Sequence, residues 1–265
     1  MAIIVYMEKE IYFINGMPRS GSTLLCNILS QNPEFHATAT SGLSDIIYDI
    51  DEIWQKNASI KASENPEKKL TIIRDLIHSY HGDIERPVVF NKSRGWAPII
   101  ELLEMSLQKN VKILTTTRNL PSILASFEKL YRKELKMVDS PMLKSREMSI
   151  LSNRVNIWAN GIVGSTFNTI QDAFLRGYKD RFHLIDYDML TTDPLTEMIK
   201  VYEFLEKPYF NHDFKNIIQY TSEKDTEHGF TDLHTIRSVV APQVDDSKEI
   251  LGSLFNQFVN FHYNF

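Results

Sequence analysis

Short apolar runs alternate along this chain with segments whose apolar residues recur at helical spacing. Runs rich in β-branched and aromatic residues predict buried strands over residues 11–15, 35–38, 87–92, 111–117 and 182–187. Helical spacing or a helix-opening proline predicts helices over residues 24–32, 44–57, 66–80, 98–108, from 121 onward, 194–205, and most of 145–176 with breaks at Gly161 and Gly164. Repeated alternation of strand and helix is typical of a parallel sheet covered on both faces. We therefore expect a three-layer α/β fold with a central, mostly parallel sheet.

Composition narrows the class of protein further. A chain of 265 residues with 43% hydrophobic residues can bury one good core, and no linker or repeat divides it. We expect a single domain over residues 1–265, with helical insertions near 44–80 and 131–176. The net charge of −5 argues against a broad nucleic-acid surface but allows a local basic pocket for a small anion.

The sequence also bears on the compartment of the protein. The single cysteine, Cys26, excludes an intrachain disulfide, so nothing demands an oxidising environment. No apolar stretch is long enough to span a bilayer, and the first residues do not resemble a signal peptide. We expect a cytoplasmic protein without a membrane span, and the sequence leaves its oligomeric state open.

A glycine-containing loop between the first strand and the first helix carries the clearest chemical signal. It reads Gly16-Met17-Pro18-Arg19-Ser20-Gly21-Ser22-Thr23. Such a loop binds phosphate, because glycines let backbone N–H groups point inward and the helix N-terminus adds unpaired donors. The spacing is that of a Walker A loop, but Ser22 replaces the expected lysine and the cation has moved to Arg19. The residues expected to surround the phosphate are Pro18, Arg19, Ser20, Gly21, Ser22 and Thr23.

Cationic and hydroxyl side chains follow three further predicted strands. Lys92, Arg118 and Tyr187 each stand where one of these strands ends, and Ser126 lies on the helix after Arg118. Ligands of parallel α/β sheets bind beyond the carboxyl ends of the strands. We therefore expect these side chains to converge with the phosphate loop on one anionic ligand.

Together these motifs resemble the sulfotransferase family that uses 3′-phosphoadenylyl sulfate (PAPS). Residues 18–24 look like the family's loop for the 5′-phosphosulfate, and the segment from Arg118 to Ser126 looks like its 3′-phosphate motif. Tyr187 is similar to a tyrosine that lies near the adenine. The resemblance spans roughly residues 11–206 and is closest to the tyrosylprotein and carbohydrate branch. It implies a P-loop NTPase-like sulfotransferase fold.

The resemblance implies sulfonate transfer from PAPS to a hydroxyl of an acceptor such as a carbohydrate, a tyrosine or a small alcohol. PAPS carries two separated anionic groups, and arginine suits bidentate recognition of phosphate. By analogy with phosphoryl transfer, charge builds on the leaving oxygen during in-line transfer. Arg19 and Lys92 are the candidates to neutralise this charge, and Lys92 lies where the family places a lysine that touches the sulfonate.

The chain departs from the family at the general base for the acceptor hydroxyl. Arg94 occupies the position of a histidine in cytosolic members, and residues 38–42 lack the glutamate of the tyrosylprotein branch. The nearest candidates are His36, Asp45 and Asp49, and we assign the role to His36 or Asp45. In a late loop, Arg237 is a candidate contact to the 3′-phosphate, while His234 is as consistent with a surface position as with a role in the site.

Two other functions fit part of the pattern. A P-loop kinase or NTPase would need a lysine at position 22 and an acidic magnesium ligand after the 111–117 strand, and the sequence has neither. A non-catalytic binder of adenosine 3′,5′-bisphosphate (PAP) would keep the nucleotide site and lack the base. The eight histidines show no metal-ligand spacing. We expect no metal, with PAPS as co-substrate and a hydroxyl acceptor as the small-molecule partners.

Overall fold

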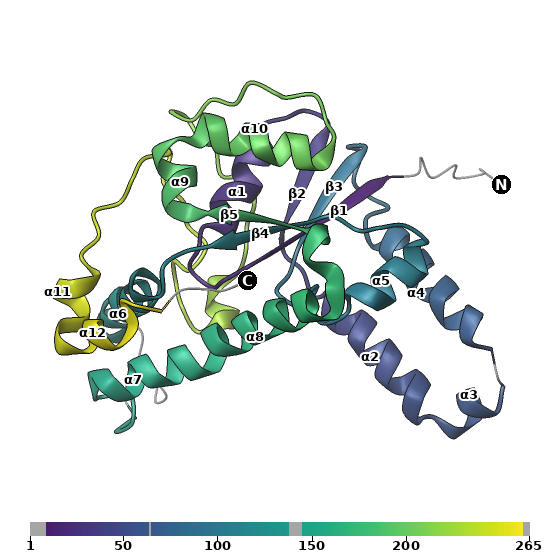
Figure 1. Cartoon of the computed structure of the whole chain (residues 1–265), viewed down its shortest axis with the longest axis horizontal. Helices are drawn as coiled ribbons and strands as arrows, with labels where there is room; N and C mark the ends of the chain where they lie inside the picture. Colours follow the sequence, from purple (N-terminus) through teal and green to yellow (C-terminus); the bar gives the residue numbers. More distant parts are fainter. Residues whose placement is uncertain (1–8, 64, 138–144, 262–265) are drawn as a thin grey trace.

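Five parallel strands form the centre of the computed structural model, which describes residues 9–63, 65–137 and 145–261 (Figure 1). Their bounds are β1 Glu10–Gly16, β2 Phe35–Thr40, β3 Val88–Lys92, β4 Ile113–Thr117 and β5 Phe182–Asp186. They lie in the order β2-β3-β1-β4-β5, and each neighbouring pair is parallel. The five predicted strands are confirmed, and β2 continues two residues beyond its predicted end.

Helices connect these strands. Their bounds are α1 Ser22–Leu29, α2 Leu43–Lys56, α3 Ala58–Ala62, α4 Pro66–Tyr80, α5 Ile100–Leu107, α6 Leu120–Met137, α7 Leu151–Trp158, α8 Gly164–Ala173, α9 Tyr187–Thr192, α10 Pro194–Leu205, α11 Ser247–Leu251 and α12 Phe255–Phe258. Predicted helices agree with α2, α4 and α10 to within one residue. Asn57 does not continue α2, because its side chain accepts hydrogen bonds from Ser59 and Ile60 and caps α3.

Two local features differ from the predicted pattern. Gly161 breaks the helix as expected, inside a π-helical turn over Ala159–Val163, but Gly164 has ordinary helical angles and begins α8. Tyr187 starts α9 rather than ending β5, because the Asp186 side chain accepts hydrogen bonds from two N–H groups of the first turn. Residues 138–144 of the insertion expected near 131–176 lie outside the described residues.

The sheet is covered on both faces, which confirms the three-layer α/β prediction. Successive side chains of a strand point to opposite faces. Ile11 and Phe13 of β1 pack in one core with α2, α4, α5 and α6. Tyr12 and Ile14 pack in a second core with α1 and α10. The continuous apolar run of β1 follows from burial on both sides, which is typical of the centre of a parallel sheet.

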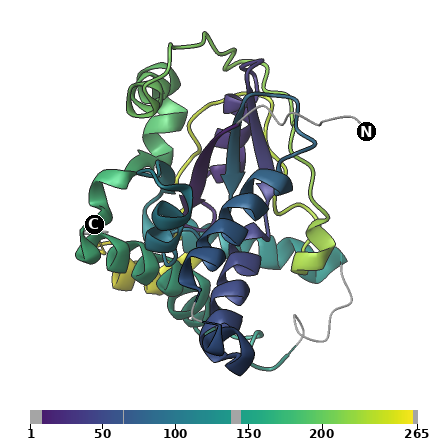
Figure 2. The ribbon, with the colours of Figure 1, turned by 90° about the vertical axis from the view of Figure 1, so that its right-hand side faces the viewer.

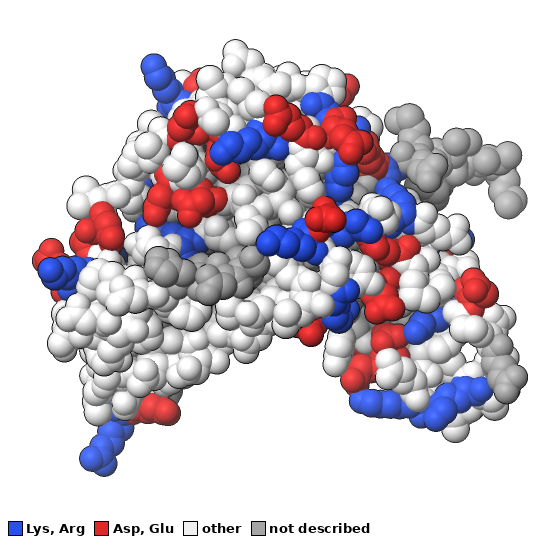
Figure 3. Space-filling model, in the orientation of Figure 1, with Lys and Arg blue, Asp and Glu red and all other residues white. Residues whose placement is uncertain are grey.

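The topology places the strand ends that matter for binding beside one another. From central β1 the chain builds β2 and β3 on one side and β4 and β5 on the other, so the connections diverge at the carboxyl end of β1. Figures 1 and 2 show α2–α4 projecting from the sheet as an arm, away from α10. Acidic and basic side chains are interspersed on the face in Figure 3. Within the described ranges, no helix has the length and apolar character needed to cross a membrane.

Candidate active site

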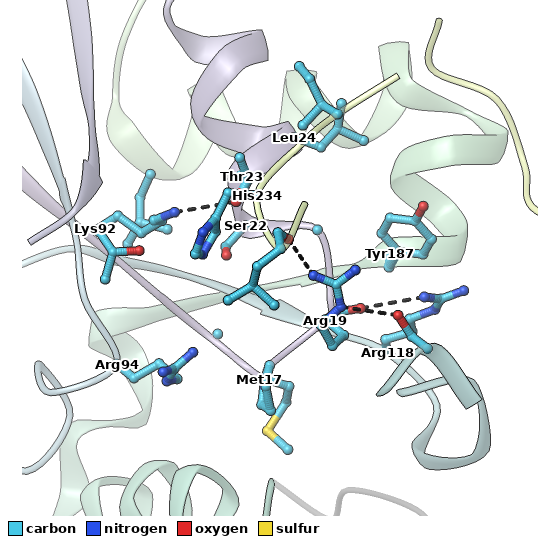
Figure 4. A pocket seen from close by; sticks show the side chains of 18 of the residues that line it. Met17, Arg19, Ser22, Thr23, Leu24, Lys92, Arg94, Arg118, Tyr187 and His234 are labelled. Carbon is cyan, nitrogen blue, oxygen red and sulfur yellow. Dashed lines mark hydrogen bonds between the residues drawn. The ribbon is translucent and has the colours of Figure 1, made fainter. Parts of the chain in front are cut away.

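A cavity of about 640 Å³ opens beyond the carboxyl ends of the strands. Residues that follow β1, β3, β4 and β5 line it, and parts of α2, α6 and the segment 228–243 complete its wall. The predicted site residues at this wall are Pro18, Arg19, Gly21, Ser22, Thr23, Asp45, Lys92, Arg118, Ser126, Tyr187 and Arg237. Figure 4 shows the loop residues between Lys92 on one side and Arg118 on the other. The strand ends therefore do converge as the sequence indicated.

The loop between β1 and α1 has an unusual backbone. Arg19 and Gly21 have φ angles of 61° and 90°, in the left-handed region. A residue with a side chain pays about 1–2 kcal/mol there, and such strain gathers at functional sites. Because α1 begins at Ser22, the N–H groups of its first turn have no partner within the helix. The loop therefore presents free backbone donors at the cavity wall.

Ser20 is the loop residue that the structure places differently from the prediction. It is 1% exposed, and its hydroxyl donates to the carbonyl of Met17 at 2.5 Å or to that of Thr116 at 3.0 Å. Its Oγ also lies 2.6 Å from Thr116 Oγ1. The Ser20 side chain thus ties the loop to β4 and does not reach the cavity.

Gly21 leaves no room for a side chain, since a Cβ there would lie 2.5 Å from the Tyr187 ring. We expect Gly21→Ala to weaken PAP binding about tenfold or more, because strain of 1–2 kcal/mol and the clash both displace the loop. Calorimetric titration with PAP measures the effect. Gly42→Ala is the matched control, because its Cβ would meet nothing within 4 Å and its φ is −83°. Unchanged PAP affinity in Gly21→Ala would contradict this account of the loop.

Two guanidinium groups lie beside each other beyond β1 and β4. Arg19 donates from Nε to Ser126 Oγ at 3.1 Å and from Nη1 to the carbonyl of Leu233, and Arg118 donates to the carbonyl of Arg19 at 3.4 Å. The Tyr187 ring packs under Arg118, 4.3 Å from its guanidinium carbon. Burial and the adjacent Arg118 charge lower the pKa of Arg19.

Carboxylates lie near these two cations without pairing with them: the charge of Asp225 acts on Arg19, and the charge of Arg118 acts on Asp245. In the part of the chain that the structure describes, neither arginine forms an ion pair with a carboxylate. Arg118 Nε is buried and has no hydrogen-bond partner there. Leaving a buried charged donor unsatisfied is costly. The pair is therefore suited to an anion that supplies both charge and acceptor atoms.

Lys92 connects β3, the phosphate loop and the late segment of the chain. Its ammonium lies 2.9 Å from Glu223 Oε1 and donates to Thr23 Oγ1 at 3.3 Å, and both ion-pair side chains are 6% exposed. Burial alone would raise the pKa of Glu223, but the Lys92 charge and the hydrogen bonds from Thr40 outweigh it and lower the pKa. A charge-balanced ammonium therefore stands directly at the loop.

Glu223 and Asp225 are two acids of the site, with buried side chains, that the sequence pattern does not predict. Asp225 accepts a hydrogen bond from the backbone N–H of His234 at 3.0 Å, and its Oδ1 lies 2.6 Å from His234 Nδ1. Between α10 and α11, Glu223 lies in irregular backbone and Asp225 begins a short 3-10 helix, Asp225–His228, so no periodicity predicts their side-chain contacts. The sequence pointed to this region only through the candidates His234 and Arg237. No motif or spacing singled out Glu223 or Asp225.

Three potential metal ligands also meet in this segment, a grouping that the spacing of the histidines did not suggest. Glu223, His228 and His234 each offer an atom within 4.8 Å of the others. Glu223 Oε2 lies 3.2 Å from His234 Nδ1 and 3.8 Å from His228 Nε2. However, Lys92 already holds the other oxygen of Glu223, and Asp225 holds His234 Nδ1. A cation at this point would have to displace these contacts and face the Lys92 ammonium.

Comparison with known proteins identifies the family to which this site belongs. The family model of the sulfotransferase family matches residues 12–211. This chain belongs to the sulfotransferase family. A search of curated protein sequences finds no significant match. The matched segment ends before Glu223, so the late wall of the cavity lies outside it.

Solved structures share the fold of this sulfotransferase at low sequence identity. Mouse sulfotransferase SULT7A1 in complex with PAP is 16% identical, covers 95% of this chain and 81% of its own, and has a TM-score of 0.54. A sulfotransferase from Alicyclobacillus acidocaldarius is 15% identical over 96% of this chain and 94% of its own, with a TM-score of 0.53. The sulfotransferase domain of the Synechococcus PCC 7002 olefin synthase is 17% identical, covers 94% of this chain and 96% of its own, and has a TM-score of 0.51.

The two predicted base candidates have different places in this sulfotransferase. Asp45 lies in the first turn of α2 and lines the cavity. His36 does not line it. His36 lies on β2, where it pairs with Val89 of β3, four residues before Thr40 and hence roughly 13 Å from the strand end at 3.3 Å per residue. Burial and the Arg86 charge lower the pKa of His36. The structure thus brings Asp45, and not His36, to the site.

Two further arginines complete the wall of the sulfotransferase cavity. Arg94 lines the cavity and makes no hydrogen bond or ion pair with any described residue. Arg237 is exposed, and its guanidinium donates to the carbonyl of Ala241 at 3.0 Å. Arg94 can approach an anionic ligand directly, whereas Arg237 would first have to leave its contact with Ala241.

Proposed function

We propose that this sulfotransferase moves the sulfonate of PAPS to a hydroxyl group of a carbohydrate, a tyrosine or a small alcohol. One observation carries the proposal: Arg19 and Arg118 lie at one cavity without carboxylate partners among the described residues, and Lys92 stands across the loop. PAPS carries a 3′-phosphate and a 5′-phosphosulfate, so it needs two separated anion contacts. The mouse relative, which binds PAP, supports the choice of nucleotide.

The proposed roles follow from the positions of the side chains. Arg118, with Ser126 and Tyr187 beside it, receives the 3′-phosphate through a rigid fork of donors. The loop of residues 18–23 receives the 5′-phosphosulfate with its backbone N–H groups and Arg19. Lys92 contacts the transferring sulfonate and offsets the charge that grows on the leaving oxygen. Preorganised charges of this kind supply a large part of the rate in group transfer.

The two alternatives predict different ligands and activities. A kinase or NTPase would hold Mg²⁺-ATP, but Ser22 stands in place of the lysine and β4 ends in threonines rather than an aspartate. A non-catalytic protein would bind PAP and release no sulfonate.

Calorimetric titration followed by turnover distinguishes these functions. We expect PAP to bind in the presence of a chelator, and ATP with magnesium to bind more weakly. We also expect PAPS labelled on sulfur to yield PAP and a sulfated product when offered a panel of a monosaccharide, a tyrosine peptide and simple alcohols. A preference for ATP with magnesium would favour the kinase, and PAP binding without turnover would favour the non-catalytic binder.

A further inference from the structure

One imidazole of the cavity is held in a single orientation by a buried carboxylate. Asp225, 8% exposed, accepts from the backbone N–H of His234 with Oδ2 and lies 2.6 Å from His234 Nδ1 with Oδ1. The short contact places the Nδ1 proton toward Asp225, so Nε2 carries the lone pair. Nε2 has no hydrogen-bond partner in the described ranges, and the ring lines the cavity (Figure 4). A base oriented by a carboxylate in this way recurs in nucleophilic and acyl-transfer sites.

The segment that carries His234 is fixed to the same helix that carries Ser126. Glu134 of α6 is fully buried and accepts hydrogen bonds from the N–H and the hydroxyl of Thr231, at 2.9 and 2.6 Å. Arg19 adds a hydrogen bond to the carbonyl of Leu233. The imidazole is thus positioned relative to the phosphate loop by contacts on both sides, as a preorganised site requires.

Charged groups of both signs surround the His234 imidazole. It faces Asp225 and Glu223, the ammonium of Lys92, and the ring of His228 at a centroid distance of 5.6 Å. Burial lowers the pKa of His234, and the two carboxylates oppose that change. Glu223 is the poorer base, because its ion pair with Lys92 lowers its own pKa.

We propose that His234 is the general base for the acceptor hydroxyl and that Asp225 is its positioning residue; this inference rests on the proposed function. The acceptor O–H proton moves to Nε2 of His234 as the acceptor oxygen forms its bond to sulfur. The bond from sulfur to the bridging oxygen breaks, and its electron pair stays on the 5′-phosphate of PAP. The imidazolium then releases the proton to solvent. Lys92, which donates to Thr23 Oγ1, and His234 line the same cavity, so charge neutralisation and proton removal occur on one sulfonate.

Two variants test the base. We expect His234→Gln to lower kcat for PAP formation from PAPS by about 10²–10⁴-fold, as loss of a general base does. PAP affinity by calorimetry stays unchanged, because the base does not touch the product nucleotide. Asp225→Asn keeps the imidazole but not its orientation, and we expect a smaller fall in kcat. His36→Gln, on β2 away from the cavity, is the matched histidine control and is expected to keep wild-type turnover.

The pH profile separates a proton acceptor from a structural histidine. Wild-type kcat should fall as pH decreases through a pKa below the ordinary value for histidine, since the protonated ring cannot accept the proton. His234→Gln should lose this acidic limb, and Asp225→Asn should shift it to lower pH because a negative neighbour is removed. A retained acidic limb and near wild-type kcat in His234→Gln would overturn the inference.

The same assays separate failure of this inference from failure of the proposed function. If wild-type protein neither binds PAP nor forms it from PAPS, even with water as the acceptor, the proposed function fails. If wild-type protein is active but a chelator abolishes turnover and Zn²⁺ restores it, Glu223, His228 and His234 hold a metal and His234 is not the base. We expect turnover to be unaffected by the chelator.

Discussion

Arg118→Ala is expected to weaken PAP binding strongly and to leave the binding of AMP, which lacks the 3′-phosphate, unchanged. Removing one partner of a desolvated, hydrogen-bonded charge pair costs about 2–5 kcal/mol. Arg118 is the protein's partner in this proposed pair. The Tyr187 ring packs against its guanidinium group, and its buried Nε has no hydrogen-bond acceptor among the described residues. The selectivity for the 3′-phosphate, rather than the size of the loss alone, identifies the role of this arginine.

Calorimetry with PAP and AMP on the same protein preparation measures both effects. Arg74→Ala on α4 is the control, because the Arg74 side chain is 39% exposed, does not line the cavity, and pairs with its neighbour Asp75 at 3.5 Å. Arg118→Lys is informative in addition, since lysine keeps the charge but loses the fork of donors; it should recover only part of the affinity. An equal loss for PAP and AMP would place Arg118 on the 5′ side and would contradict the proposed orientation of the nucleotide.

The parts of the site that the sequence predicted are those formed by local structure. The loop of residues 16–23 and its place between a strand and a helix are encoded by residues next to one another. Lys92, Arg118 and Tyr187 converge because parallel strands end at one edge of the sheet, so topology alone brings them together. The parallel topology was therefore enough to predict that residues from four separate strand ends line one cavity.

The parts that the sequence could not predict depend on contacts between distant, irregular segments. Glu223 lies 131 residues from Lys92, and no helix or strand pattern sets the direction of its side chain. The sequence predicted that the Ser20 hydroxyl would contact phosphate, as hydroxyls of such loops do. In the structure this hydroxyl is hydrogen-bonded to Thr116 on β4 instead. His36 and Asp45 were equivalent as candidates by residue type, and only their positions along β2 and α2 separate them. Burial and partner choice, rather than composition, decide each of these cases.

Lys92→Met is expected to lower kcat by about 10²–10³-fold while PAP affinity stays close to that of the wild type. Lys92 is proposed to meet the sulfonate, which PAP lacks, so the loss should appear in the rate and not in product binding. The rate of PAP formation from labelled PAPS and calorimetry with PAP measure the two quantities. A parallel loss of PAP affinity would place Lys92 on the nucleotide instead of on the transferring group.

This substitution also leaves Glu223 as a buried carboxylate without its cation, and the loss of stability must be separated from the loss of catalysis. Breaking a buried ion pair by removing one partner costs roughly 3–5 kcal/mol. The double variant Lys92→Met/Glu223→Gln removes both charges at a pair whose side chains are 6% exposed, so thermal unfolding should return toward the wild type. The rate should not return, because the sulfonate still lacks its ammonium. Recovery of both stability and kcat in the double variant would show that Lys92 serves to neutralise Glu223, and that another group, such as Arg19, stabilises the leaving oxygen.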